Sequence, residues 1–183
     1  MEIIKHRVNK LKDIESHLGI EIDIRDYKNE LVLAHDHPDD QCVKLDNFLK
    51  NISKEQLIAI NVKSSEIELD LKRILDGLQI SNYFTFDWAI PSLRKALSND
   101  ITCAFRLSEY EKDVISDCTW TWIDCFEGIW YDANFLDSLK KSGLKLAIVS
   151  PELHNRESDI SKVKDIINST KIDAICTDHP ELW

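Results

Sequence analysis

The chain has 183 residues, of which 43% are hydrophobic, so it can bury one sizeable core but is short for two comfortable domains. Its 33 acidic and 23 basic residues give a net charge of −10, which disfavours general attraction to nucleic acid or to an anionic membrane surface. We therefore expect a single domain over residues 1–183 that does not bind nucleic acid.

The sequence shows neither a targeting signal nor a cysteine pattern typical of disulfides or zinc sites. The N-terminal segment lacks the apolar core of a signal peptide, and no apolar run is long enough to span a bilayer, so we expect a cytoplasmic protein without stable membrane insertion. The five cysteines are scattered without a close pair, which predicts reduced thiols and no zinc site. Exposed tryptophans would suit a homodimer interface as readily as a pocket, so a homodimer is left open.

Strands and helices are predicted to alternate along the whole chain. Segments with strand character start near residues 3, 20, 57, 83, 101, 120, 144 and 172, and residues 31–34 form an additional return strand. Apolar residues at helical spacing indicate helices over residues 11–18, 45–52, 66–78, 91–97, 133–141 and 160–167. No internal repeat, linker or low-complexity tract marks a domain boundary.

This alternation of eight strands with helices predicts a compact (β/α)8 TIM barrel with minimal connections. Barrels of this kind usually have ~200 residues or more, so a smaller open α/β sheet is the structural alternative. In a barrel, functional side chains collect at the carboxyl ends of the strands.

The stretch from Gly19 to Pro38 carries the most specific pattern. Its alternation puts Glu21 and Asp23 on one face of a strand and three isoleucines on the other. A polar turn over residues 27–30 then reverses the chain and places His35 after the return strand. On its own, a Glu-x-Asp pair is more often a solvated face than a metal site.

Polar residues at the other strand ends extend this pattern. Glu21 and Asp23 offer hard oxygens to Mg²⁺ or Ca²⁺, while Arg7 and Lys63 have the charge to hold a phosphate. His6 and His35 come from different strands and would serve as general acid and base. Near later strand ends lie further candidates for binding substrate or phosphate: Arg106, Asp124, Glu152 and His154.

In order along the chain, these residues form motifs that resemble the glycerophosphodiester phosphodiesterases, within the wider superfamily of phosphatidylinositol-specific phospholipases C. The matching motifs are His6-Arg7, Glu21-Ile22-Asp23, His35-Asp36, Asn61-Val62-Lys63, Thr85-Phe86-Asp87 and Thr177-Asp178-His179-Pro180. The resemblance covers essentially the whole chain. It implies a barrel in which His6 and His35 are the acid–base pair and Glu21 and Asp23 bind a divalent cation.

Three departures from the family pattern are present. Val8 replaces the glycine that follows His-Arg in the family, and Asn61 replaces the glutamate that serves as third metal ligand. Glu109, Asp124 and Glu152 are candidates to supply the missing carboxylate. Only a short helix fits between His35 and Lys63, where the family usually inserts a small cap, so we expect a more open mouth.

We therefore predict a metal-dependent phosphodiester hydrolase acting on a small-molecule, glycerol- or sugar/polyol-linked phosphodiester. The alternative is a catalytically inactive barrel that binds a phosphorylated ligand, because Asn61 removes one negative charge from the metal site. A third interpretation is a lyase whose reaction stops at a cyclic phosphate, and it differs from the hydrolase only in its product.

Overall fold

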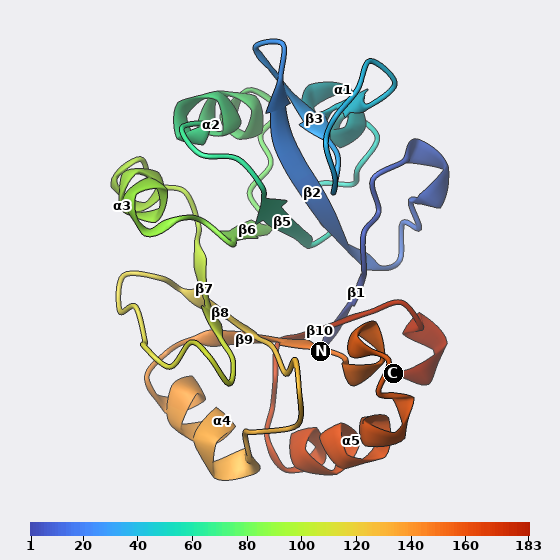
Figure 1. The fold of residues 1–183 in the computed structure, drawn as a ribbon, viewed down its shortest axis with the longest axis vertical. Helices are drawn as coiled ribbons and strands as arrows, with labels where there is room; N and C mark the ends of the chain where they lie inside the picture. Colours follow the sequence, from blue (N-terminus) through green and yellow to red (C-terminus); the bar gives the residue numbers. More distant parts are fainter.

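A computed structural model describes residues 1–183 and contains a nearly closed barrel of eight parallel strands (Figure 1). The barrel strands are β1 (Glu2–Lys5), β2 (Gly19–Tyr27), β5 (Ile58–Val62), β6 (Tyr83–Phe86), β7 (Ala104–Leu107), β8 (Trp120–Ile123), β9 (Lys145–Val149) and β10 (Ala174–Thr177). Neighbouring strands pair in this order except at β6 and β7, and β10 returns to pair with β1. The predicted (β/α)8 barrel is confirmed. The alternative, a smaller open α/β sheet, is wrong.

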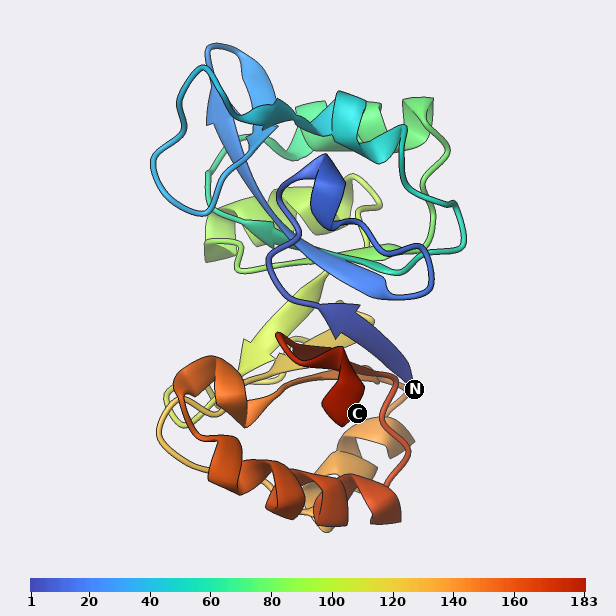
Figure 2. The same cartoon turned by 90° about the vertical axis from the view of Figure 1, so that its right-hand side faces the viewer.

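One junction of the barrel is weaker than the others. β6 and β7 share only an isolated bridge between Thr85 and Cys103, whereas every other pair of neighbours shares at least two residue pairs. We call this β6–β7 junction the seam. Figure 2 shows the blue and green segments on one side of the molecule and the yellow to red segments on the other, with β1 between them.

The predicted hairpin is present and extends the sheet beside β2. β3 (Glu30–Leu33) runs antiparallel to β2, and the short β4 (Val43–Lys44) pairs with β3. Lys28 and Asn29, between β2 and β3, have φ angles of 49° and 63°. Two successive left-handed residues form the tight hairpin turn whose twist matches that of the flanking strands.

Five α-helices are enough for this barrel because several connections have none. The helices are α1 (Leu45–Leu49), α2 (Glu68–Gly77), α3 (Ile90–Ser98), α4 (Ala133–Lys141) and α5 (Ile160–Ser169). No α-helix follows β1, β7 or β10, and residues 108–119 connect β7 to β8 without regular structure. These omissions explain how 183 residues close a barrel. None of the helices has both the length and the apolar character that crossing a membrane requires.

The helix expected over residues 11–18 is wrong. Only Leu11–Asp13 forms a single 3-10 turn, and Gly19 begins β2 instead of ending a helix. A Cβ atom at Gly19 would lie 3.2 Å from the backbone oxygen of Leu57 and 3.2 Å from the Ile4 side chain. The glycine therefore permits close strand packing at the bottom of the barrel.

Apolar side chains form two separate cores, one between strands and helices and one inside the barrel. The inner core contains two aromatic stacks. Phe84 stacks on Trp120 with ring centroids 4.4 Å apart, and Phe86 stacks on Trp122 at 4.0 Å. The barrel interior is therefore filled and leaves no central channel for a ligand. We call the end of the barrel at the carboxyl ends of the strands the mouth.

The inner stacks give a direct test of the fold. Replacing Trp122 with alanine removes a buried ring and leaves a cavity, so we expect the free energy of unfolding to fall by about 3–5 kcal/mol. Urea unfolding measures this loss. Leu69→Ala, at a side chain that is exposed on α2, is the control and should change stability by less than about 0.5 kcal/mol. A similar small effect of Trp122→Ala would contradict the packed interior.

Candidate active site

Glu21 and Asp23 on β2 point into the barrel, as their alternation predicts. Ile20, Ile22 and Ile24 belong to the outer core between the strands and the helices. Both acidic side chains are buried, with 2% and 1% of their residue surfaces exposed. Two neighbouring carboxylates that are both buried from solvent require hydrogen-bond donors or positive charges as partners.

The loop after β1 supplies partners for both carboxylates. The backbone N–H of Arg7 donates to Glu21 Oε2 at 2.7 Å, and Arg7 adopts a left-handed φ of 54°. Asn9 binds Asp23 twice: its Nδ2 donates to Asp23 Oδ2 at 2.8 Å, and its Oδ1 accepts the Asp23 backbone N–H at 2.9 Å. Sequence analysis missed Asn9, because nothing in the pattern separates it from an ordinary loop asparagine.

Val8 fits without strain where the family has glycine. The left-handed conformation falls on Arg7, so the next position does not need glycine's freedom. Val8 is fully buried in the outer core, and its N–H donates to the backbone oxygen of Glu21 at 2.8 Å. The substitution therefore leaves the loop anchored to β2.

Two buried oxygens in this region have no hydrogen-bond partner: Asp23 Oδ1 and Asn61 Oδ1. Asp23 and Asn61 are paired in the register of β2 and β5. Lys63 Nζ lies 3.4 Å from Asp23 Oδ1, at ion-pair distance but without hydrogen-bond geometry, and Arg7 Nε lies 3.9 Å from Asp23 Oδ2. Unpartnered buried oxygens are costly, and a cation is one species that satisfies them.

The donor set therefore fits a divalent cation, although it is one carboxylate short. Glu21, Asp23 and Asn61 together present hard oxygen atoms, which Mg²⁺ and Ca²⁺ prefer. No group of three histidine, cysteine, aspartate or glutamate side chains is arranged to hold a metal ion, and the third position here is an amide. Asn61 contributes a neutral oxygen where a glutamate would add a negative charge.

The other carboxylates considered for the third ligand have partners elsewhere. Glu109 accepts the backbone N–H groups of three consecutive residues, Phe126, Glu127 and Gly128. Glu152 accepts the hydroxyls of Ser150 and Thr177 and, at 3.3 Å, the backbone N–H of Asp178. Glu152 thus joins the ends of β9 and β10, and Glu109 holds the loop after β8.

His6 and His35 are oriented in the same way by aspartates. His6 Nδ1 lies 2.9 Å from Asp178 Oδ1, and His35 Nδ1 lies 2.9 Å from Asp36 Oδ1. Burial lowers the pKa of His6, and the contact with Asp178 opposes this shift. With Nδ1 engaged, Nε2 is the nitrogen that each ring offers for proton transfer.

Arg25 fixes the backbone on either side of this region. Its Nε and Nη2 donate to the backbone oxygen of His35 at 3.2 and 2.9 Å, and its Nη1 donates to the backbone oxygen of Lys63 at 3.3 Å. One guanidinium therefore links the segment after β3 to the end of β5. Sequence analysis missed Arg25, although the same alternation places residue 25 on the face of Glu21 and Asp23.

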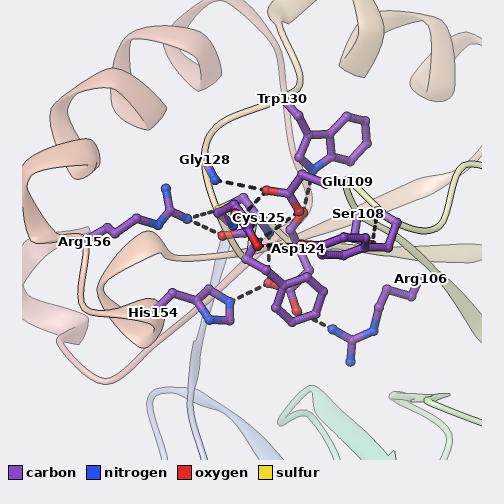
Figure 3. Close-up of polar contacts among 12 residues, drawn as sticks. Arg106, Ser108, Glu109, Asp124, Cys125, Gly128, Trp130, His154 and Arg156 are labelled. Carbon is purple, nitrogen blue, oxygen red and sulfur yellow. Dashed lines mark hydrogen bonds and ion pairs between the residues drawn. The ribbon is translucent and has the colours of Figure 1, made fainter.

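Across the mouth, the later strands carry a row of paired charges that we call the polar wall, comprising Asp87, Arg106, Asp124 and His154. Figure 3 shows Arg106, Asp124 and His154 of this set. Arg106 binds Asp87 with two nitrogens, at 3.0 Å from Nε and 2.6 Å from Nη2, and its Nη1 donates to Asp124. His154 Nε2 lies 2.7 Å from Asp124 Oδ1. Arg106 is therefore neutralised by two aspartates and is not a free phosphate clamp.

The fold is similar to that of several solved structures. A glycerophosphodiester phosphodiesterase from Thermotoga maritima aligns with a TM-score of 0.75 and 16% identity, covering 98% of this chain and 95% of its own. A glycerophosphoryl diester phosphodiesterase from Parabacteroides distasonis aligns with a TM-score of 0.73 and 12% identity, over 99% and 84% of the two chains.

A third similar structure is a phosphodiesterase from Oleispira antarctica, in complex with the product sn-glycerol-3-phosphate. It aligns with a TM-score of 0.69 and 16% identity, over 99% of this chain and 94% of its own. No family model and no curated protein sequence matches the chain. The chain thus has the fold of the glycerophosphodiester phosphodiesterases, which the motif resemblance predicted.

The buried carboxylates should leave a signature in the pH dependence of stability. Burial and the neighbouring Asp23 raise the pKa of Glu21 from 4.5 to about 8, so between these values the folded protein keeps a proton that the unfolded chain releases. Stability therefore falls as the pH rises from 4.5 to 8. Glu21→Gln, which cannot ionise, should be more stable than the unmodified protein at pH 8 by at least about 2 kcal/mol.

Chemical unfolding at several pH values, with a chelator present, measures this difference. The gain in Glu21→Gln should shrink to near zero below pH 4.5, where both states are protonated. Glu55→Gln, at an exposed position, is the matched control and should show no such trend. A pH-independent difference between Glu21→Gln and the unmodified protein would contradict the raised pKa.

Proposed function

We propose that the protein is a phosphodiester hydrolase of the glycerophosphodiester phosphodiesterase type. The observation that carries this proposal is the pair of unpartnered buried oxygens on Asp23 and Asn61, beside Glu21 in a mouth that also holds two aspartate-oriented histidines. The shared fold supports it, since three similar structures are described as phosphodiesterases of this kind.

Glu21, Asp23 and Asn61 would hold a divalent cation, Mg²⁺ or Ca²⁺. Such an ion cancels the repulsion of the carboxylates and polarises a phosphoryl oxygen when bound. Arg7 and Lys63, one near each oxygen of Asp23, carry the positive charge to hold the remaining phosphate oxygens. Both side chains form ion pairs with Asp23, and these ion pairs keep their positive charges beside the proposed cation site.

His6 and His35 would perform the proton transfers through Nε2. One takes a proton from a substrate hydroxyl beside the phosphate as that oxygen bonds to phosphorus, and the other gives a proton to the alcohol oxygen whose bond to phosphorus breaks. Water then opens the resulting cyclic phosphate, with the two proton-transfer roles reversed. Asp178 and Asp36 favour the tautomer with the proton on Nδ1, as each aspartate accepts it. The lowered pKa of His6 suits a group that is neutral, and therefore able to accept a proton, near pH 7.

The polar wall supports a glycerol- or sugar/polyol-linked phosphodiester as substrate. Arg106, Asp124 and His154 satisfy one another's charge but keep further hydrogen-bonding capacity, which suits neutral hydroxyl groups better than a second anion. Glu152 would act indirectly, because its bonds position Asp178 and through it His6.

The second candidate function is a catalytically inactive barrel that binds a phosphorylated ligand. The amide at position 61 favours it, because it lowers the charge available to hold a cation. Both functions use the same mouth, and only turnover separates them.

Turnover is tested by phosphorus NMR on glycerol, inositol and sugar phosphodiesters, with Mg²⁺, Ca²⁺ or a chelator. We expect metal-dependent cleavage that falls by at least about 100-fold in His6→Ala and His35→Ala, since each removes a proton-transfer group. His17→Ala, at a side chain that is 74% exposed, should retain full activity. Cleavage of no diester by the folded protein would favour the inactive barrel, and a cyclic phosphate that accumulates would identify a lyase.

The role of Asn61 is tested by restoring a carboxylate. In Asn61→Asp, calorimetric titration with Mg²⁺ or Ca²⁺ should show affinity at least about tenfold higher, because a charged oxygen replaces a neutral one. Asn168→Asp adds the same charge at an exposed position on α5 and should leave the affinity unchanged. Equal titrations for both variants would mean that Asn61 is not a ligand.

A further inference from the structure

The seam between β6 and β7 opens above its single bridge. The backbone N–H of Thr85 donates to the Thr102 oxygen at 2.9 Å, but nearer the mouth the strands are joined by side chains, Arg106 of β7 and Asp87 directly after β6. The connection between β6 and β7 contains α3, and residues 108–119 after β7 have no helix. The seam is thus bordered by the start of α3 on one side and by an irregular loop on the other.

A cavity of about 580 Å³ lies in this position. The start of α3 and the residues before it supply one side, with Trp88, Ile90 and Leu93, and the other side has Phe105 of β7 and Ile115 of the following loop. Trp88, Leu93 and Phe105 are buried, so the floor is apolar and rigidly packed. This volume is within the range of sites that bind small organic molecules.

The rim of the cavity is polar and joins it to the mouth. Asp87 and Arg106 line the cavity, and Arg106 also contacts Asp124 in the polar wall. Glu111 and Lys112, from the loop after β7, lie on the same rim. A ligand in the seam would therefore touch the same guanidinium group that faces a ligand in the mouth.

Large apolar side chains are exposed beside this opening. Ile90 and Tyr110 line the cavity, yet 62% and 68% of their surfaces are exposed. Polar alcohols such as glycerol gain nothing from covering them, whereas an alkyl chain or a ring does. The combination of apolar floor, apolar entrance and polar rim matches an amphiphilic molecule.

We propose that the seam cavity binds the apolar chain or ring of an amphiphilic alcohol that one ester bond of the substrate carries. The position of the phosphate in this inference rests on the proposed function. The cavity and its apolar lining do not depend on that function. It assigns the two alcohols of the diester to different places: a hydroxyl-rich one to the polar wall and an apolar one to the seam.

Binding is measured by calorimetry with monooctanoylglycerol, which has an apolar chain and no phosphate, below its aggregation concentration and with a chelator present. We expect Ile90→Glu to weaken binding by at least about tenfold, because it places a charge beside the apolar floor. Ile90 is the first residue of α3, where a glutamate is compatible with the helix. Leu69→Glu, an equally exposed apolar residue on α2, is the matched control and should bind normally.

The second arm compares kcat/KM for a glycerophosphodiester with and without an octanoyl chain. Binding that depends on Ile90, with preference for the acylated diester, supports the inference. Binding that depends on Ile90 without cleavage of any diester supports the seam site and refutes the proposed hydrolase function. No binding of monooctanoylglycerol, or equal binding by Ile90→Glu and Leu69→Glu, overturns the inference whatever the turnover on small diesters.

Discussion

The mouth of this barrel is organised by the mutual repulsion of two carboxylates buried side by side. Burial and mutual repulsion both disfavour the state in which Glu21 and Asp23 are charged together. Partners from two directions offset this cost in part: the loop after β1 gives the Arg7 N–H and the Asn9 amide, and Lys63 follows β5. The offset is incomplete, because the pKa of Glu21 remains raised to about 8. The left-handed backbone at Arg7 follows from the need for these partners, because it directs the Arg7 N–H at Glu21.

Local periodicity was sufficient to predict the strands and the face on which the acids lie. Burial of alternate residues is a local signal, so the strand starts and the hairpin could be derived without knowing the fold. Asn9 and Arg25 were not found, because each acts through a contact with a residue that lies far away in the sequence. Asp87 belonged to a matching motif, but its pairing with Arg106 could not be predicted for the same reason. The prediction of a helix after β1 was wrong for a related reason. The apolar residues there fit helical spacing, but the conformation is determined by the short connection between β1 and β2.

The short connections of this barrel affect how its strands are held together. The connections after β1 and β7 contain no α-helix. At β7 this omission coincides with the weakest strand pairing, and the ion pair of Asp87 with Arg106 takes over the role of backbone hydrogen bonds. The same pair, together with Asp124, occupies the guanidinium group of Arg106.

The two histidines differ in how far along the chain their aspartates lie. Asp36 is the residue after His35, while Asp178 is 172 positions from His6 and reaches it only because β10 pairs with β1. His35 is therefore oriented from within its own segment, whereas the orientation of His6 depends on the pairing of the last strand with the first. A change that loosens the contact between β10 and β1 would disturb His6 and leave the contact of His35 with Asp36 in place.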